Sequence, residues 1–146
     1  LVTKKGMAIR FDEKDARPMG RNATGVKGIT LAKEDVVVAA DLVEENNYLL
    51  VISENGYGKR TPIEEYKVQI RGGKGLKTYN IKEKTGDIVS AKVIHENDQV
   101  MLISYNGTII RLNTNDISIM GRSTQGVTLM RMNDEKVVAV AKYVED

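Results

Sequence analysis

The 146-residue chain contains no cysteine and no tryptophan, and it has only two prolines, one phenylalanine and one histidine. Without cysteine it can form neither a disulfide framework nor a thiolate centre. A zinc site of cysteine and histidine ligands is excluded, and a Ser-His-Asp arrangement would have to use His95, which has no motif around it. No apolar run approaches the roughly 18 residues that a membrane span needs, and the first ten residues lack the pattern of a secretory signal. These absences favour a cytoplasmic protein with no membrane contact, no metal and no catalytic site.

What the sequence does contain is a repeat of about 50 residues. Three blocks recur in one order, at residues 6–10, 56–60 and 107–111, then at 19–29, 69–79 and 120–130, then at 37–46, 88–97 and 138–146. Within the second block, Arg21 aligns with Arg71 and Arg122, and Gly25 aligns with Gly75 and Gly126. A repeat of 20 to 50 residues is typical of repeat architectures.

Each repeat predicts four β-strands. Apolar runs of strand length are followed by Asn-Gly, a strong hairpin signal, and then by alternating segments. The expected strands are 46–53 and 97–104, then 57–61 and 108–112, then 76–81 and 127–132, then 87–94 and 136–144. A weak helical period at 62–66 and 113–119 predicts a short turn in each place.

Four strands in about 50 residues predict an all-β, propeller-like fold with three blades, at roughly 1–46, 47–97 and 98–146. A β-sandwich with an accidental repeat is the alternative. Three blades are fewer than the four to eight of a closed ring. Leu1 aligns with Val51, so the first unit lacks most of its opening strand. The sequence therefore predicts a piece of a longer protein with an exposed apolar sheet edge.

The positive charge is concentrated in residues 56–82, which hold seven basic and two acidic side chains, although the net charge of the chain is only +2. At the centre lies the loop QIRGGKG, residues 69–75. Glycines allow backbone N–H groups to approach an anion, Arg71 can bind phosphate oxygens in a fork, and Lys74 adds a compact charge. The loop predicts polyanion binding, and a solvated turn is the alternative.

Arginines recur at equivalent positions of the repeats, at 10, 60 and 111 and at 21, 71 and 122. In an array of blades, equivalent residues lie on one rim. A curved row of cations can follow a bent phosphate backbone with little sequence preference. The six tyrosines are scattered, which favours duplex DNA over a single strand stacked on aromatic rings.

Four segments resemble the C-terminal domain of the DNA gyrase A subunit, and resemble topoisomerase IV less closely. They are ENGYGKRTPIEEY (54–66), IRGGKGLKT (70–78), MGRNATGVKGI (19–29) and ISIMGRSTQGV (117–127). The resemblance covers essentially the whole chain. It implies a β-pinwheel whose neighbouring blades exchange strands, with this chain similar to the last three of six blades. It also implies binding and wrapping of duplex DNA in support of ATP-dependent negative supercoiling.

The same resemblance bears on the loop at 69–75. The family's signature box reads Gln, a basic residue, Arg, Gly, Gly, Lys, Gly, and lies in the first blade. Six positions match it, namely Gln69, Arg71, Gly72, Gly73, Lys74 and Gly75, while Ile70 replaces the second basic residue. Because the match falls in what corresponds to the fifth blade, we expect the box itself upstream of Leu1. The resemblance places the catalytic tyrosine, ATP and metal in other domains, so it implies no cofactor here. The implied partners are the gyrase B subunit and the N-terminal cleavage core of the gyrase A subunit, in a heterotetramer with two copies of each.

We predict phosphate contacts in three groups. The strongest are Arg71, Lys74 and Lys77, and the supporting ones are Lys59, Arg60 and Lys67. Weaker candidates on the rim are Arg10, Arg21, Lys27, Arg111, Arg122 and Arg131. The alternatives are the C-terminal domain of the topoisomerase IV A subunit and a protein-interaction propeller with solvated cations. A small-molecule enzyme ranks last, because no acid/base or nucleophile constellation is visible.

Overall fold

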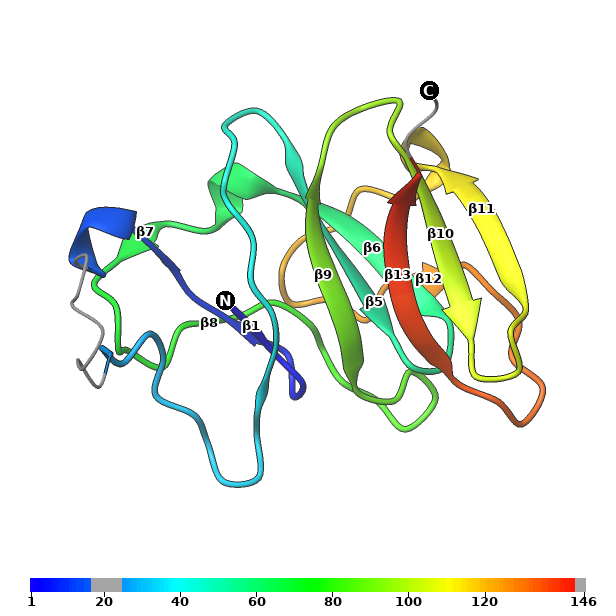
Figure 1. The fold of residues 1–146 in the computed structure, drawn as a ribbon, viewed down its shortest axis with the longest axis horizontal. Helices are drawn as coiled ribbons and strands as arrows, with labels where there is room; N and C mark the ends of the chain where they lie inside the picture. The colour runs from blue at the N-terminus through cyan, green and yellow to red at the C-terminus, as the bar shows by residue number, and fades with distance from the viewer. Residues whose placement is uncertain (17–24, 144–146) are drawn as a thin grey trace.

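The computed structural model describes residues 1–16 and 25–143, and over these residues it contains β-strands and three 3₁₀ turns but no α-helix. Three larger sheets follow one another along the molecule (Figure 1), beside a two-stranded one. The first has the order β4-β1-β2-β8, comprising Val37–Ala39, Val2–Thr3, Met7–Ala8 and Leu76–Lys77. The second has the order β9-β5-β6-β12, comprising Ile88–Ile94, Tyr48–Ser53, Tyr57–Pro62 and Val127–Thr128. The third has the order β13-β10-β11, comprising Val137–Tyr143, Gln99–Ser104 and Ile109–Asn113.

Short elements join these sheets. Strand β3 (Arg10–Phe11) pairs in parallel with β7 (Val68–Gln69). The turns are η1 (Glu13–Asp15), η2 (Ile63–Glu65) and η3 (Thr114–Asp116). The last two confirm the short turns predicted at 62–66 and 113–119.

Strand β5 shows why an apolar run rather than an alternating one forms the centre of a sheet here. Its side chains point alternately to opposite faces. Leu49 and Val51 enter a core shared with the first sheet, and Leu50 and Ile52 enter a core shared with the third. Both faces are covered, so neither needs polar residues. The stacked sheets agree with the predicted propeller-like arrangement and not with a sandwich.

The predicted exchange of strands is confirmed. Strand β8 follows the second unit's hairpin in sequence but pairs with β2 of the first sheet, as Met7↔Lys77 and Ala8↔Leu76. Strand β12 pairs in the same way with β6, as Val127↔Gly58 and Thr128↔Tyr57. Each of these sheets therefore takes its outer strand from the next unit along the chain.

Two details of the prediction differ from the structure. The strands expected at 76–81 and 127–132 pair over only two residues each. The ladder ends because the N–H groups of Thr78 and Tyr79 both donate to the carbonyl of Gly6, at 2.8 and 3.3 Å. The third sheet has three strands in the described part of the chain, not four.

Candidate nucleic-acid interface

The loop at 69–75 is held against the segment 25–30 of the preceding unit. Arg71 Nε donates to the carbonyl of Asp15 at 2.7 Å, and its Nη1 donates to the carbonyl of Lys27 at 3.0 Å. The Gly72 N–H donates to the carbonyl of Gly28 at 2.7 Å. This N–H is therefore engaged within the protein and does not point at an anion as the loop's glycines suggested.

Arg122 repeats this contact one unit later. Its Nη1 donates to the carbonyl of Lys77 at 3.1 Å, which is the position equivalent to Lys27. The recurring arginine thus clamps its loop onto the equivalent strand segment of the unit before it, which gives a structural reason for its recurrence. Arg21, the first member of this series, lies outside the described residues.

The glycine that follows each clamp is required by close packing. Gly75 and Gly126 have φ of +80° and +76°, a region that side-chain-bearing residues rarely adopt. A Cβ at Gly126 would lie 2.6 Å from the carbonyl oxygen of Gly58, and one at Gly75 would overlap that of Ala8. These glycines let the exchanged strand reach its partner, which is a structural reason for their place in the repeat.

Lys59 is fully buried, so its predicted role as a supporting phosphate contact is wrong. Its Nζ donates to the carbonyls of Gly121, Arg122 and Thr124 at 2.7, 2.8 and 3.1 Å, and to Thr124 Oγ1 at 2.9 Å. The ammonium also lies 5.1 Å from the centre of the Tyr79 ring. Burial lowers the pKa of Lys59 to about 8. The side chain holds the loop of the third unit in place.

Arg60 is 7% exposed and likewise does not belong to a phosphate-binding surface. Its Nε donates to the carbonyl of Ile117 at 2.7 Å, and its guanidinium lies 4.6 Å from the centre of the Tyr48 ring. Arg10 makes the equivalent contact one unit earlier, donating to the carbonyl of Tyr66 at 3.1 Å. It is also paired with Glu45, so its charge is compensated.

The remaining cations gather around the two clamped loops. Lys27, Lys74 and Lys77 are exposed, and none of them forms an ion pair within the described residues. Together with the partly exposed Arg71 and Arg122 they form a surface that we call the basic rim. Its members come from adjacent units. Arg71 of the second unit contacts the backbone of Lys27 in the first unit, and Arg122 of the third contacts that of Lys77 in the second.

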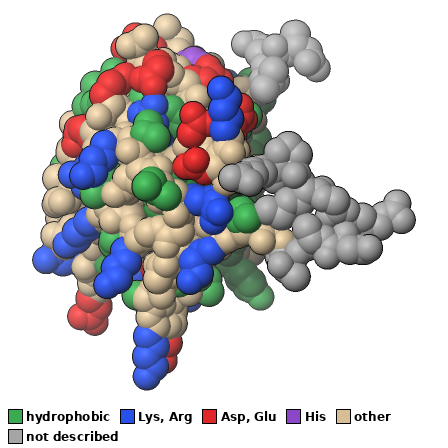
Figure 2. Space-filling view, turned by 90° about the vertical axis from the view of Figure 1, so that its left-hand side faces the viewer, with side chains coloured by type: hydrophobic (Ala, Val, Ile, Leu, Met, Phe, Trp, Pro, Cys, Tyr) green, Lys and Arg blue, Asp and Glu red, His purple; other side chains and the backbone are tan. Residues whose placement is uncertain are grey.

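Figure 2 views the end of the molecule that carries η1 and β7. Lys and Arg side chains occupy much of the middle and lower part of this face, while most Asp and Glu side chains lie in its upper part. Acidic groups also touch the basic rim, because Glu65 Oε1 accepts a hydrogen bond from the Arg122 N–H at 3.2 Å.

Three other predicted cations are exposed but are not joined to the basic rim by a described hydrogen bond. Lys67 precedes β7, and Arg131 follows β12. Arg111 lies on strand β11 of the third sheet, where its guanidinium is 4.7 Å from the centre of the Tyr143 ring. Outside these predicted residues, a shallow depression beside the third unit's loop is lined by Lys82, Glu83, Lys84 and Gln125.

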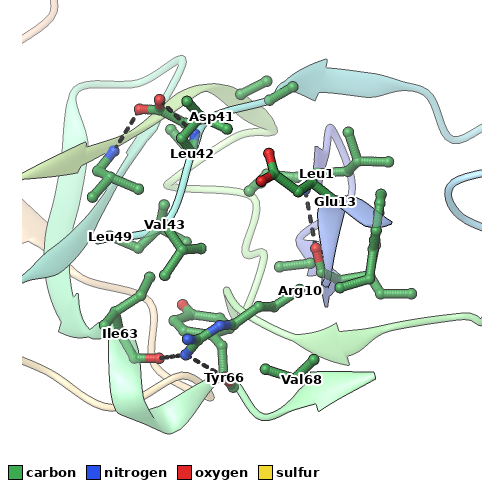
Figure 3. A pocket seen from close by; sticks show the side chains of 18 of the residues that line it. Leu1, Arg10, Glu13, Asp41, Leu42, Val43, Leu49, Ile63, Tyr66 and Val68 are labelled. Atoms are coloured by element: carbon green, nitrogen blue, oxygen red, sulfur yellow. Dashed lines mark hydrogen bonds between the residues drawn. The ribbon is translucent and has the colours of Figure 1, made fainter. Parts of the chain in front are cut away.

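A separate cleft of about 590 Å³ lies beside strand β1 (Figure 3). Its walls are largely apolar and include Leu42, Val43, Leu49 and Ile63. The charged side chains that line it are one cation, Arg10, and four carboxylates, Asp12, Glu13, Asp41 and Glu45. This charge is unsuited to a phosphate backbone. No group of three or more His, Cys, Asp or Glu side chains in the described chain could hold a metal ion. The described residues also contain no helix with the length and apolar character of a membrane span.

Comparisons of this chain with known families, sequences and structures agree with one another. The family described as "DNA gyrase C-terminal domain, beta-propeller" matches residues 1–44, 47–95 and 98–142. The chain is 47% identical over 149 aligned residues to the A subunit of DNA gyrase from Staphylococcus aureus strain MRSA252, and equally to that from strain NCTC 8325. It spans 17% of the length of these relatives.

Two solved structures share the fold. One is a DNA gyrase A C-terminal domain, with a TM-score of 0.87 and 30% identity, over 98% of this chain and 49% of that one. The other is a C-terminal domain of DNA topoisomerase IV, with a TM-score of 0.90 and 25% identity, over 97% of this chain and 45% of that one.

Proposed function

Because the chain belongs to the DNA gyrase C-terminal domain family, we propose that it binds and wraps duplex DNA with little sequence preference, as part of a type II topoisomerase. Gyrase is favoured over topoisomerase IV, since the chain is 30% identical to the solved gyrase domain and 25% identical to the solved topoisomerase IV domain. The chain itself is non-catalytic in this proposal. It supports negative supercoiling in the cytoplasm, while cleavage, ATP and magnesium belong to other domains of the A subunit and to the gyrase B subunit.

The observation that carries the proposal is the repeated juxtaposition within the basic rim. Arg71 donates a hydrogen bond to the backbone carbonyl of Lys27, and Arg122 donates one to that of Lys77, in two successive units. The exposed ammonium groups are not paired with described carboxylates and can therefore replace counterions on DNA phosphates. The spacing of these cations is fixed by hydrogen bonds from the arginine side chains to backbone carbonyls. It does not depend on side chains that would read a base sequence. The rim is therefore suited to contacting phosphates, which position DNA without specifying its sequence.

The basic rim predicts a defined dependence of affinity on salt. Replacing both Lys74 and Lys77 by Gln should weaken binding to unrelated duplexes equally. The slope of log affinity against log salt should flatten by about 1.8, from roughly 0.9 per lost phosphate contact. Fluorescence anisotropy of a labelled duplex at several salt concentrations measures both effects. Neither substitution removes a described hydrogen bond of the side chain, so the melting temperature should not change.

Lys142→Gln is the matched control, since Lys142 is also exposed but lies on β13 in the third sheet. Its salt slope should stay that of the unmodified protein. An unchanged slope in the double variant would remove Lys74 and Lys77 from the interface. An absence of duplex binding even at low salt would instead favour the protein-interaction alternative.

A further inference from the structure

The loop of the third unit is folded around a buried ammonium group. From inside the molecule, Lys59 Nζ donates hydrogen bonds to the carbonyls of Gly121, Arg122 and Thr124. The position equivalent to Lys59 in the first unit holds Ile9, an apolar residue that faces the loop of the second unit. Of the two described loops, the third unit's is therefore the one with a cation beneath it.

Because three carbonyls of this loop point inward, the N–H groups on the other side of the same peptides point outward. The described peptide bonds are all trans, and in a planar trans peptide the C=O and the following N–H have opposite directions. The N–H groups of Arg122, Ser123 and Gln125 therefore face away from Lys59. Among the described residues, those of Ser123 and Gln125 have no hydrogen-bond acceptor, whereas the equivalent Gly72 N–H of the second unit donates to a backbone carbonyl.

A carboxylate already lies on the outward side of the loop. Glu65 Oε1 accepts a hydrogen bond from the Arg122 N–H at 3.2 Å, and it would lie 3.5 Å from a Cβ added at Gly121. Glu65 is exposed and forms no ion pair within the described residues. The guanidinium of Arg122 does not hold it, since its Nη1 donates to the carbonyl of Lys77. The anion is bound here by backbone and not by a side chain.

The buried ammonium makes the outer side of the loop a better anion site. Hydrogen bonds that share a peptide group polarise one another, so an N–H is a stronger donor when its carbonyl is bonded to a cation. Backbone N–H groups that lie together on one side of a turn form anion-binding concavities. Gln125 also lines the shallow depression with Lys82, Glu83 and Lys84, which adds two cations against one carboxylate.

We propose that residues 121–125 form a backbone anion site for one phosphate group of duplex DNA, and that Glu65 occupies this site until DNA displaces it. The inference rests on the proposed function, which supplies the phosphate. Carboxylate and phosphate oxygens both accept charge-assisted hydrogen bonds from backbone N–H groups. The two anions need the same donor, so one excludes the other. Glu65 is then a competitor of DNA for a defined site and not only a charge that repels it.

Glu65→Ala empties the site without removing any of its donors. It should strengthen binding to a labelled duplex by about fivefold, the equivalent of one net hydrogen bond that no longer has to be given up. Glu64→Ala is the matched control, since it removes the same charge from the same turn, but Glu64 Oε1 accepts from the Asn46 N–H at 2.9 Å. The control should change the affinity by less than about twofold, because salt screens the general field of exposed charges. Fluorescence anisotropy measures both, and equal gains would overturn the proposal.

Nuclear magnetic resonance of the isotope-labelled chain observes the donors directly. Inorganic phosphate, added at constant ionic strength, should shift the amide signals of Ser123 and Gln125 at a lower concentration in Glu65→Ala than in the unmodified chain. The amide of Gly72 is the internal reference, because its N–H is bonded within the protein. An absence of shifts at Ser123 and Gln125 in Glu65→Ala would overturn the proposal. Shifts without a gain in duplex affinity would assign the site to free phosphate and overturn its role in DNA binding.

A failure of this inference can be told apart from a failure of the proposed function. If only the inference is wrong, the double variant of Lys74 and Lys77 still loses affinity for the duplex, while Glu65→Ala gains none. If the unmodified chain binds no duplex even at low salt, both are wrong. Glu64 and Glu65 are exposed, so both alanine variants should keep the melting temperature of the unmodified chain, and circular dichroism checks this.

Discussion

Lys59 shows at the scale of one residue how a charge can belong to the interior. Lys59 occupies the repeat position that the apolar Ile9 has in the first unit. Its ammonium donates hydrogen bonds to inward-facing backbone carbonyls of the third unit's loop. Desolvation disfavours its charged form, which is why its pKa falls to about 8. A buried cation of this kind is stabilising only while its hydrogen bonds are complete.

We therefore expect Lys59→Met to lower the free energy of unfolding by about 2–3 kcal/mol, because the carbonyls of Gly121, Arg122 and Thr124 lose their shared donor. Urea unfolding monitored by circular dichroism measures this. Lys67→Met, which alters an exposed lysine, should change the free energy by less than about 0.5 kcal/mol. Equal effects of the two substitutions would show that the buried ammonium has no such structural role.

At the scale of one element, the exchanged strand is what joins each unit to the one before it. It is only two residues long, so its position is set less by ladder hydrogen bonds than by the loop before it. In that loop Gly72 and Gly75 both have positive φ, but their surroundings differ. Beside Gly72 the nearest described atom to an added Cβ is the carbonyl oxygen of Lys27 at 3.5 Å, an ordinary contact. Beside Gly75 the Cβ would overlap the carbonyl of Ala8.

This difference separates backbone strain from close packing. Gly72→Ala should cost about 1–2 kcal/mol of unfolding free energy, the penalty for an L-residue in a left-handed conformation. Gly75→Ala should cost at least about 2 kcal/mol more, since β8 must move away from β2. Thermal unfolding of the two variants at one low protein concentration gives the comparison. If the two melting temperatures fell by the same amount, packing against Ala8 would not be the reason for glycine at this position.

Strand content and unit length could be read from the sequence, because the hydrophobic runs and the Asn-Gly turns are local signals. Strand exchange was implied by the resemblance and could not be derived from periodicity, since a strand such as β8 has the same local pattern whichever sheet receives it. The role of each cation was harder still to predict from the sequence. Lys59 and Lys77 both look like surface lysines in the sequence, but one is enclosed by carbonyls from residues 121–124 and the other is exposed. Long-range packing decides between them, and no local pattern reports it.

At the scale of the whole molecule, one histidine connects the first unit to the turn between the second and third units. His95 follows β9, and its Nε2 lies 2.6 Å from Oε2 of Glu44, which is in the first unit. Its Nδ1 lies 3.3 Å from Oδ2 of Asp98, in the turn that opens the third unit. The hydrogen bond with Glu44, and then that with Asp98, raises the pKa of His95 above its ordinary value of 6.5. The charged imidazolium can pair with both carboxylates at once.

This arrangement predicts a pH-dependent contribution to stability. Because the folded-state pKa is raised, the contribution is fully present below the unfolded-state value of 6.5 and is lost as the pH rises through the folded-state pKa. The melting temperature of the unmodified protein should therefore exceed that of His95→Gln at about pH 5.5, and the difference should vanish at about pH 8.5. Glu44→Gln should reduce the difference at the lower pH, since it removes the nearer carboxylate while leaving Asp98. A difference of the same size at both pH values would mean that His95 acts through packing and not through its charge, and that the units are not joined by this titrating contact.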